Sequence, residues 1–130
     1  MIYQDCWSEV SAGNCVYSGH TLTGDELRVF VERGLDTWSE RLQKHVQSDG
    51  SSGVGRCALI FYGVSQYQWR ETPFTKSADG QVAWGQAETE QFGDVALQAG
   101  EQYFLDGTTL GASKAIWAEI RARGFALEAQ

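Results

Sequence analysis

The chain has 130 residues, of which 42% are hydrophobic and 21% charged, the balance of a single globular domain long enough to bury a core. No stretch approaches the roughly 18 apolar residues of a membrane span, and the N-terminus lacks the basic start and apolar run of a secretory signal. We therefore expect one domain over residues 1–130, in the cytoplasm and without a membrane segment. The three cysteines would stay reduced there, as small buried hydrophobic side chains.

The net charge of −7 is concentrated in one part of the chain. Residues 77–113 carry six acids and neither lysine nor arginine, which leaves the remainder close to neutral. A surface of one sign repels nucleic acid and anionic membranes but attracts basic proteins. We therefore expect no direct binding of DNA or RNA and no membrane association.

In chain order, the first segment with a strong pattern is residues 23–47, because residues 1–21 suggest only short strands at 2–3 and 15–17. Thr23 and Glu26 have the spacing of a helix capping box, and Leu22 and Leu27 that of a hydrophobic staple. Apolar side chains then recur at helical spacing. These are Leu27, Phe30, Val31, Leu35, Trp38, Leu42 and Val46. The pattern predicts a helix over 23–47.

Residues 56–70 are expected to hold the centre of a sheet. Cys57 to Val64 are apolar at nearly every position, which is typical of a strand covered on both faces. Beyond them Tyr67 and Trp69 alternate with polar residues, as in a strand with one wet face. This stretch therefore predicts a strand that runs from the middle of the sheet to its rim.

The remaining segments predict further strands and a second helix. Asp79-Gly80 is a hairpin signal, and a two-residue loop would place Phe74 opposite Gly85. Residues 81–91 would follow as an outer strand, with Gln86, Glu88 and Glu90 on the same face as Val82 and Trp84. Short strands are expected at 95–97 and 103–105. The apolar positions Ala112, Ile116, Trp117 and Ile120, followed by Gly124, predict a helix over 109–123.

Adjacent strands with a helix near each end favour an α+β fold. We expect an antiparallel sheet of about four to five strands, with the helices at 23–47 and 109–123 packed on one face.

Two groups of residues have side chains suited to chemistry. Glu88 and Glu90 lie two apart on an expected strand, so their carboxylates would share one face at a spacing compatible with acid–base work. Cys6, Cys15, His20 and Cys57 could supply zinc ligands, yet they lack the C-x₂-C spacing of structural zinc sites. We therefore expect no metal and no other cofactor.

The leading functional hypothesis is a non-enzymatic inhibitor that docks on a basic protein, such as a toxin or a nuclease component. Toxin-immunity proteins and phage-encoded anti-defence inhibitors, including anti-CRISPR proteins, have this small, acidic character. Aromatic side chains among acids suit such a surface. The expected contact residues are Trp69, Trp84, Glu88, Glu90, Asp94, Glu101 and Asp106.

Two other functions remain open at this point. One is a small enzyme or ligand-binding domain that uses the Glu88/Glu90 pair. The other is an assembly subunit, or a homodimer, that covers an apolar face by self-association.

Overall fold

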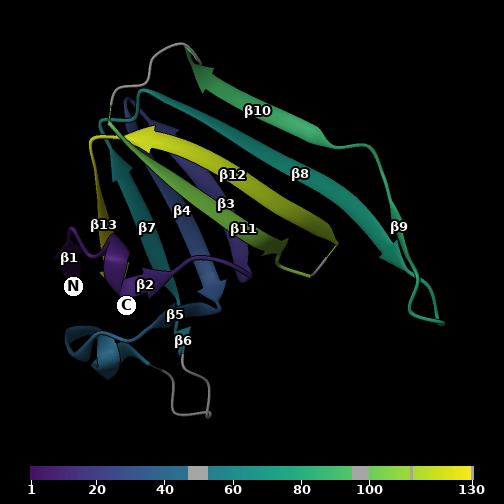
Figure 1. Cartoon of the computed structure of the whole chain (residues 1–130), viewed down its shortest axis with the longest axis horizontal. Coiled ribbons are helices and arrows are strands. Elements are labelled where there is room, and N and C mark those ends of the chain that lie inside the picture. The colour runs from purple at the N-terminus through teal and green to yellow at the C-terminus, as the bar shows by residue number, and fades with distance from the viewer. Residues whose placement is uncertain (47–52, 95–99, 112, 130) are drawn as a thin grey trace.

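The computed structural model describes residues 1–46, 53–94, 100–111 and 113–129, and these residues are nearly all in β-strands (Figure 1). Their helical segments are two short 3₁₀ turns, η1 (Trp7–Glu9) and η2 (Glu40–His45). The expected α+β fold with two packed helices is therefore wrong, and the chain is a β-protein.

Within the described residues, ten strands form one mixed sheet and three form a smaller one. The path through the large sheet is β1-β13-β7-β4-β3-β11-β12-β8-β10, with β9 paired to β8. Adjacent strands of the large sheet are antiparallel, except β3 and β11, which run parallel to each other. The strands of the large sheet are β1 (Ile2–Gln4), β3 (Cys15–Thr23), β4 (Glu26–Arg33), β7 (Cys57–Tyr62), β8 (Gln66–Lys76), β9 (Val82–Trp84), β10 (Glu88–Gly93), β11 (Glu101–Thr109), β12 (Lys114–Ala122) and β13 (Gly124–Ala129). Those of the small sheet are β2 (Val10–Ser11), β5 (Leu35–Thr37) and β6 (Gly53–Val54).

The predicted first helix is a hairpin followed by a short strand and a 3₁₀ turn. Thr23 pairs with Glu26 across a two-residue turn, in which Gly24 adopts φ +63°, a conformation that glycine tolerates without strain. Leu22 and Leu27, expected to staple a helix start, are cross-strand partners on the inner side of this hairpin. The polar turn residues thus serve a β-turn, although their spacing also satisfies a capping box.

The side chains of β4 alternate with a period of two. Leu27, Val29 and Val31 are buried, whereas Phe30 between them is partly exposed. Gly34 then ends the strand at φ +97°, and the backbone of Cys15 lies within 3.2 Å of the position that a Cβ would occupy. Leu27, Val31 and Leu35 are spaced by four, which fits both a helix and a strand, and Val29 is the residue that separates the two periods.

The predicted second helix is β12, for a similar reason. Its buried residues are Ile116, Ala118, Ile120 and Ala122, an unbroken alternation. Ile116 and Ile120 again have a spacing common to both periods, and the small Ala118 and Ala122 contributed little to the hydrophobic pattern.

The strand expected to run from the middle of the sheet to its rim over residues 56–70 is wrong as one element, because these residues form two strands, β7 and β8, which β4, β3, β11 and β12 separate in the sheet. The central position of its first half is confirmed in β7, which lies between β4 and β13. Leu59 and Phe61 face the main core, while Ile60 is buried on the other face with Ala58 and Ala126. Tyr62, in the run expected to be covered on both faces, is only partly buried at the strand end.

The alternation predicted for residues 66–70 is also confirmed in β8, where Tyr67 and Trp69 are buried. The turn after β8 contains Asp79-Gly80 as predicted, but the loop has five residues, 77–81, so Phe74 pairs with Trp84 and not with Gly85. The strand expected at 103–105 lies within β11, and the one at 95–97 falls outside the described residues.

We call the face of the large sheet that lines the main core the inner face. The sheet curls over this face (Figure 1), so Tyr17 on β3 contacts Trp69 on β8 although β11 and β12 lie between these strands. Trp7 on η1 covers one end of the core, with its ring 5.0 Å from those of Tyr103 and Phe125.

The three cysteines are free and buried in the core, as the sequence predicted. Burial raises the pKa of Cys15 to about 11 and that of Cys57 to about 12, so both are neutral thiols at physiological pH.

The helical segments of the described residues lack the length and hydrophobicity of a membrane-spanning helix.

Candidate functional site

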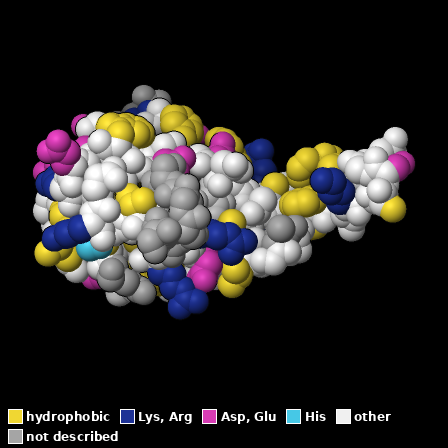
Figure 2. All heavy atoms as spheres, turned by 90° about the horizontal axis from the view of Figure 1, so that it is seen from below, with side chains coloured by type: hydrophobic (Ala, Val, Ile, Leu, Met, Phe, Trp, Pro, Cys, Tyr) yellow, Lys and Arg dark blue, Asp and Glu magenta, His cyan; other side chains and the backbone are white. Residues whose placement is uncertain are grey.

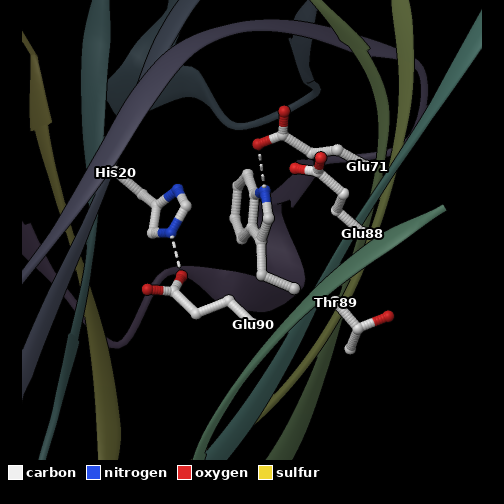
Figure 3. Close-up of a pocket in the computed structure, with 6 residues that line it drawn as sticks. His20, Glu71, Glu88, Thr89 and Glu90 are labelled. Atoms are coloured by element: carbon white, nitrogen blue, oxygen red, sulfur yellow. Dashed lines mark hydrogen bonds and ion pairs between the residues drawn. The ribbon is translucent and has the colours of Figure 1, made fainter.

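Two acids of the predicted contact set lie in a cleft at the β10 edge of the large sheet (Figure 3). Glu88 pairs with Glu71 and Glu90 pairs with Trp69 across the β8–β10 ladder. Partners in an antiparallel ladder share a face, so Glu71, Glu88 and Glu90 all stand on the inner face. The cleft is lined by His20, Trp69, Glu71, Glu88, Thr89 and Glu90.

A change of register between β9 and β10 determines which way these acids point. Trp84 of β9 pairs with Phe74, an outer-face position of β8, whereas Glu90 of β10 pairs with the inner-face Trp69. The expected common face for Val82, Trp84, Glu88 and Glu90 is therefore wrong, because a shift of one residue sends side chains to the opposite face. The ladder breaks at residues 85–87 and places the acids inside and the apolar residues outside.

His20 enters the cleft from β3, on the opposite wall. The β3–β4 register shifts between Tyr17 and Gly19, and this irregularity brings His20 to the inner face opposite the buried Val29. The imidazole stacks on Trp69 with 4.0 Å between ring centroids, and its Nε2 lies 2.6 Å from Glu90 Oε2. This contact joins β3 to β10 across the hollow of the sheet.

Glu90 has a second partner on its own side of the cleft. The Tyr67 hydroxyl hydrogen-bonds Glu90, and burial together with the charge of Glu90 raises the pKa of Tyr67 to about 12. The Tyr67 ring stacks on Phe92 at 5.7 Å. Glu90 is thus fixed by an imidazole and a phenol.

Glu71 and Glu88 differ in how well they are compensated. Glu71 accepts the Trp69 indole N–H at 2.9 Å and lies 3.8 Å from Lys114 Nζ. Glu88 stands directly opposite Glu71, and no described residue gives it an ion pair or hydrogen bond. Like charges at opposite positions of a ladder repel, so the free protein has unbalanced negative charge at Glu88.

The cleft continues into a neighbouring hollow of similar size. Each has a volume of about 200 Å³, and both are lined by His20, Trp69 and Glu71. The second is also lined by Tyr17, Ser18, Gly19, Thr109, Leu110 and Ile116. Together they make a groove that is acidic at the β10 edge and mainly uncharged where β3 meets the end of β11.

The other predicted contact residues lie elsewhere. Trp69 is only 2% exposed and forms the floor of the cleft, whereas Trp84 is 63% exposed on the opposite side of the sheet. Asp106 accepts the Asn14 backbone N–H at 2.6 Å, and Glu101 begins β11 near Tyr103. Asp94 follows the end of β10. The seven residues therefore do not form one surface.

Sequence reasoning missed Glu71 and the inward position of His20. Glu71 continues the alternation of Tyr67 and Trp69, so it could have been placed on the inner face. His20 follows Ser18-Gly19, and the irregularity at Gly19 was visible only as a glycine inside a β-rich segment. Cys6, Cys15 and Cys57, which with His20 lacked the spacing of a zinc site, are buried in the core. No three His, Cys, Asp or Glu side chains of the described residues are arranged to hold a metal.

No protein-family model matches the chain, and neither the curated proteins nor the solved structures contain a match to it. The toxin-immunity and anti-defence hypotheses therefore gain no support from a relative. The geometry of the cleft is the basis for a functional proposal.

Proposed function

We propose that the chain is a non-enzymatic binding protein whose acidic cleft receives a lysine or arginine side chain of a basic protein partner. The observation that carries this proposal is the Glu71–Glu88 pair, two carboxylates held opposite each other with Glu90 beside them. A cation between these groups would relieve their repulsion and form charge-assisted hydrogen bonds.

The surroundings of the cleft suit an extended segment of a partner. β10 is the last strand on its path, so one side of its backbone is not paired in the described sheet. An extended peptide can add to such an edge while its side chains enter neighbouring pockets. A volume of about 200 Å³ is enough for one long side chain, not for a large ligand.

The proposal is tested with a short extended peptide that carries one arginine, compared with the same peptide carrying glutamine. We expect calorimetry to detect binding of the arginine peptide alone, with an affinity that falls as salt is added. Glu88→Gln should weaken binding about tenfold, the equivalent of about 1.4 kcal/mol.

Glu101→Gln is the matched control, because Glu101 begins β11, whose opposite end lines the groove, and it lines neither hollow. The change removes the same charge and should leave affinity unchanged apart from a weak long-range effect. Equal binding of the two peptides, or equal losses in the two variants, would exclude the cleft as a cation site.

A second candidate, an enzyme that uses Glu88 and Glu90, is favoured by the 2.6 Å contact between His20 and Glu90. A carboxylate–imidazole pair can hold and transfer a proton beside a bound substrate. In that case Glu90→Gln would abolish turnover in a screen of glycoside substrates while binding of the arginine peptide persists.

A further inference from the structure

The two faces of the β8–β9–β10 ribbon carry opposite charge. In the ladders of this ribbon the acids Glu71, Glu88 and Glu90 are on the inner face, while the cations Arg70 and Lys76 take outer-face positions of β8. Arg70 lies over the ring of Trp117, with 5.1 Å from its guanidinium carbon to the ring centroid. The ribbon thus presents carboxylates on one side and cations with aromatic rings on the other.

The end of this ribbon projects from the body of the molecule as an arm, which we define as residues 72–85. Figure 1 shows it extending beyond the other strands, and Figure 2 shows hydrophobic and basic side chains along it, with an acidic side chain at its tip. Trp84 is 63% and Val82 45% exposed, and both lie on the outer face with Phe74 and Lys76. The Trp84 and Phe74 rings contact each other at 5.6 Å.

Such an arm is poorly stabilised by its own contacts. A two-stranded ribbon is marginally stable in water unless one face packs on something, and large apolar side chains gathered on a projecting element mark an interaction site. A partner that covers Trp84 and Val82 and offers negative charge to Lys76 would stabilise the arm.

We propose that this partner is a second copy of the chain, whose acidic cleft receives Lys76 while Trp84 and Val82 pack beside it. The proposal rests on the proposed function, because it requires that the cleft accept a cation. Charge complementarity supports it, since the inner face of the ribbon carries three carboxylates and the outer face of the same ribbon carries the cations. If both arms are exchanged about a two-fold axis, the contact closes as a dimer.

The first test is the molar mass in solution, measured by analytical ultracentrifugation over a range of concentrations up to about 0.5 mM. We expect the wild-type mass to rise to that of a dimer. Trp84→Ala and Lys76→Glu should each weaken the dimer at least tenfold. Phe104→Ala removes an aromatic ring that is 54% exposed on the body of the sheet, and this control should leave the dimer unchanged.

A charge exchange identifies the contact. Glu88→Lys should weaken the dimer, and combining it with Lys76→Glu should restore much of the affinity, because the pair is then reformed with its signs reversed. The arginine peptide should also compete and raise the monomer fraction.

Three outcomes would overturn the inference. These are a wild-type chain that stays monomeric at about 0.5 mM, a dimer insensitive to Trp84→Ala, and a double charge variant no better than the single ones. A monomeric chain that still binds the arginine peptide would refute the dimer and leave the proposed function intact. A dimer that depends on Trp84 and Lys76, formed by a chain that does not bind the arginine peptide, would instead refute the proposal that the cleft binds a basic protein partner.

Discussion

The centre of the large sheet and its β8–β10 end differ in how their side chains are covered and how their edges are paired. β7 is covered on both faces and paired on both edges, so its hydrophobic side chains are enclosed by the chain itself. Among the described residues, the ribbon of β8, β9 and β10 has an unpaired edge at β10, an acidic inner face and an aromatic outer face.

The difference separates a centre that covers its own side chains from the ribbon to which we assign the proposed binding. Side chains at the centre are complementary to one another, whereas those of the ribbon leave charge and apolar surface unmatched. Regions that bind partners commonly come from the less stable parts of a structure. Four measurements test this difference between the two regions, and hydrogen exchange should show the largest effect.

Hydrogen exchange should differ most between the two regions. We expect amides of β7 that are bonded to β4 and β13 to exchange only through global unfolding, at a cost of about 5–15 kcal/mol. Amides of β9 should exchange through local opening at a small fraction of that cost. Equal protection of β7 and β9 in dilute monomer, measured by NMR, would remove the distinction.

A matched pair of leucine truncations tests packing directly. Leu59→Ala, at a fully buried position of β7, should lower the free energy of unfolding by about 2–5 kcal/mol. Leu110→Ala, at a position 54% exposed beside the groove, should change it by less than about 0.5 kcal/mol. Urea unfolding measures both, and similar losses would show that β7 is not the organising strand.

The buried thiols predict how stability depends on pH at the centre. Folding raises the pKa of Cys57 from 9.0 to about 12, because burial disfavours the thiolate. The folded state then binds more protons than the unfolded state above pH 9, so stability is complete below pH 9 and falls as pH rises towards 12. The slope for this thiol approaches about 1.4 kcal/mol per pH unit.

Cys57→Ala should flatten that dependence between pH 9 and 11, as measured by urea unfolding. The buried Cys15 and the phenols of Tyr67 and Tyr103 contribute in the same direction, so part of the slope should remain. An unchanged slope in the variant would mean that the Cys57 thiol is accessible to ionisation in the folded state.

The smallest effect is expected within the Glu88/Glu90 pair. Glu88→Gln removes the repulsion with Glu71 and should stabilise the free protein by a few tenths of a kcal/mol, up to about 1 kcal/mol at low salt. Glu90→Gln weakens the contacts with His20 and Tyr67 and should destabilise it. Added salt should shrink the first effect, and a destabilising Glu88→Gln would show that Glu88 has a compensating partner.

The sequence correctly predicted the secondary structure of segments whose hydrophobic pattern fits a strand and does not also fit a helix. Residues 57–62 are apolar at every position and too short a run for a surface helix, and Tyr67 and Trp69 alternate cleanly. Both stretches were therefore predicted as strand, although as one continuous strand and not as the separate β7 and β8. In β4 and β12 the apolar residues spaced by four fit a helix as well, and local propensity could not decide between them. These segments become strands because they pair with strands that are distant in sequence when the sheet forms.

The cleft was predictable only in part. The spacing of Glu88 and Glu90 placed them on one face, but which face depends on the break at residues 85–87. Glu71 and His20 join them through ladders and an irregularity in β3 that depend on tertiary pairing. A charge count along the chain also grouped Glu101 and Asp106 with the cleft acids, because it contains no information about distance in space.

The position of β7 between β4 and β13 has a consequence for how the chain folds. β4 precedes β7 by a short stretch of sequence, but β13 follows it by more than sixty residues, so one edge of the most apolar strand waits for the last strand of the chain. On a ribosome that edge would emerge unpaired, with Leu59, Ile60 and Phe61 exposed to other nascent chains. Folding should accordingly be slow for the size of the domain, and the yield of native protein should depend on chaperones and synthesis rate more than on final stability.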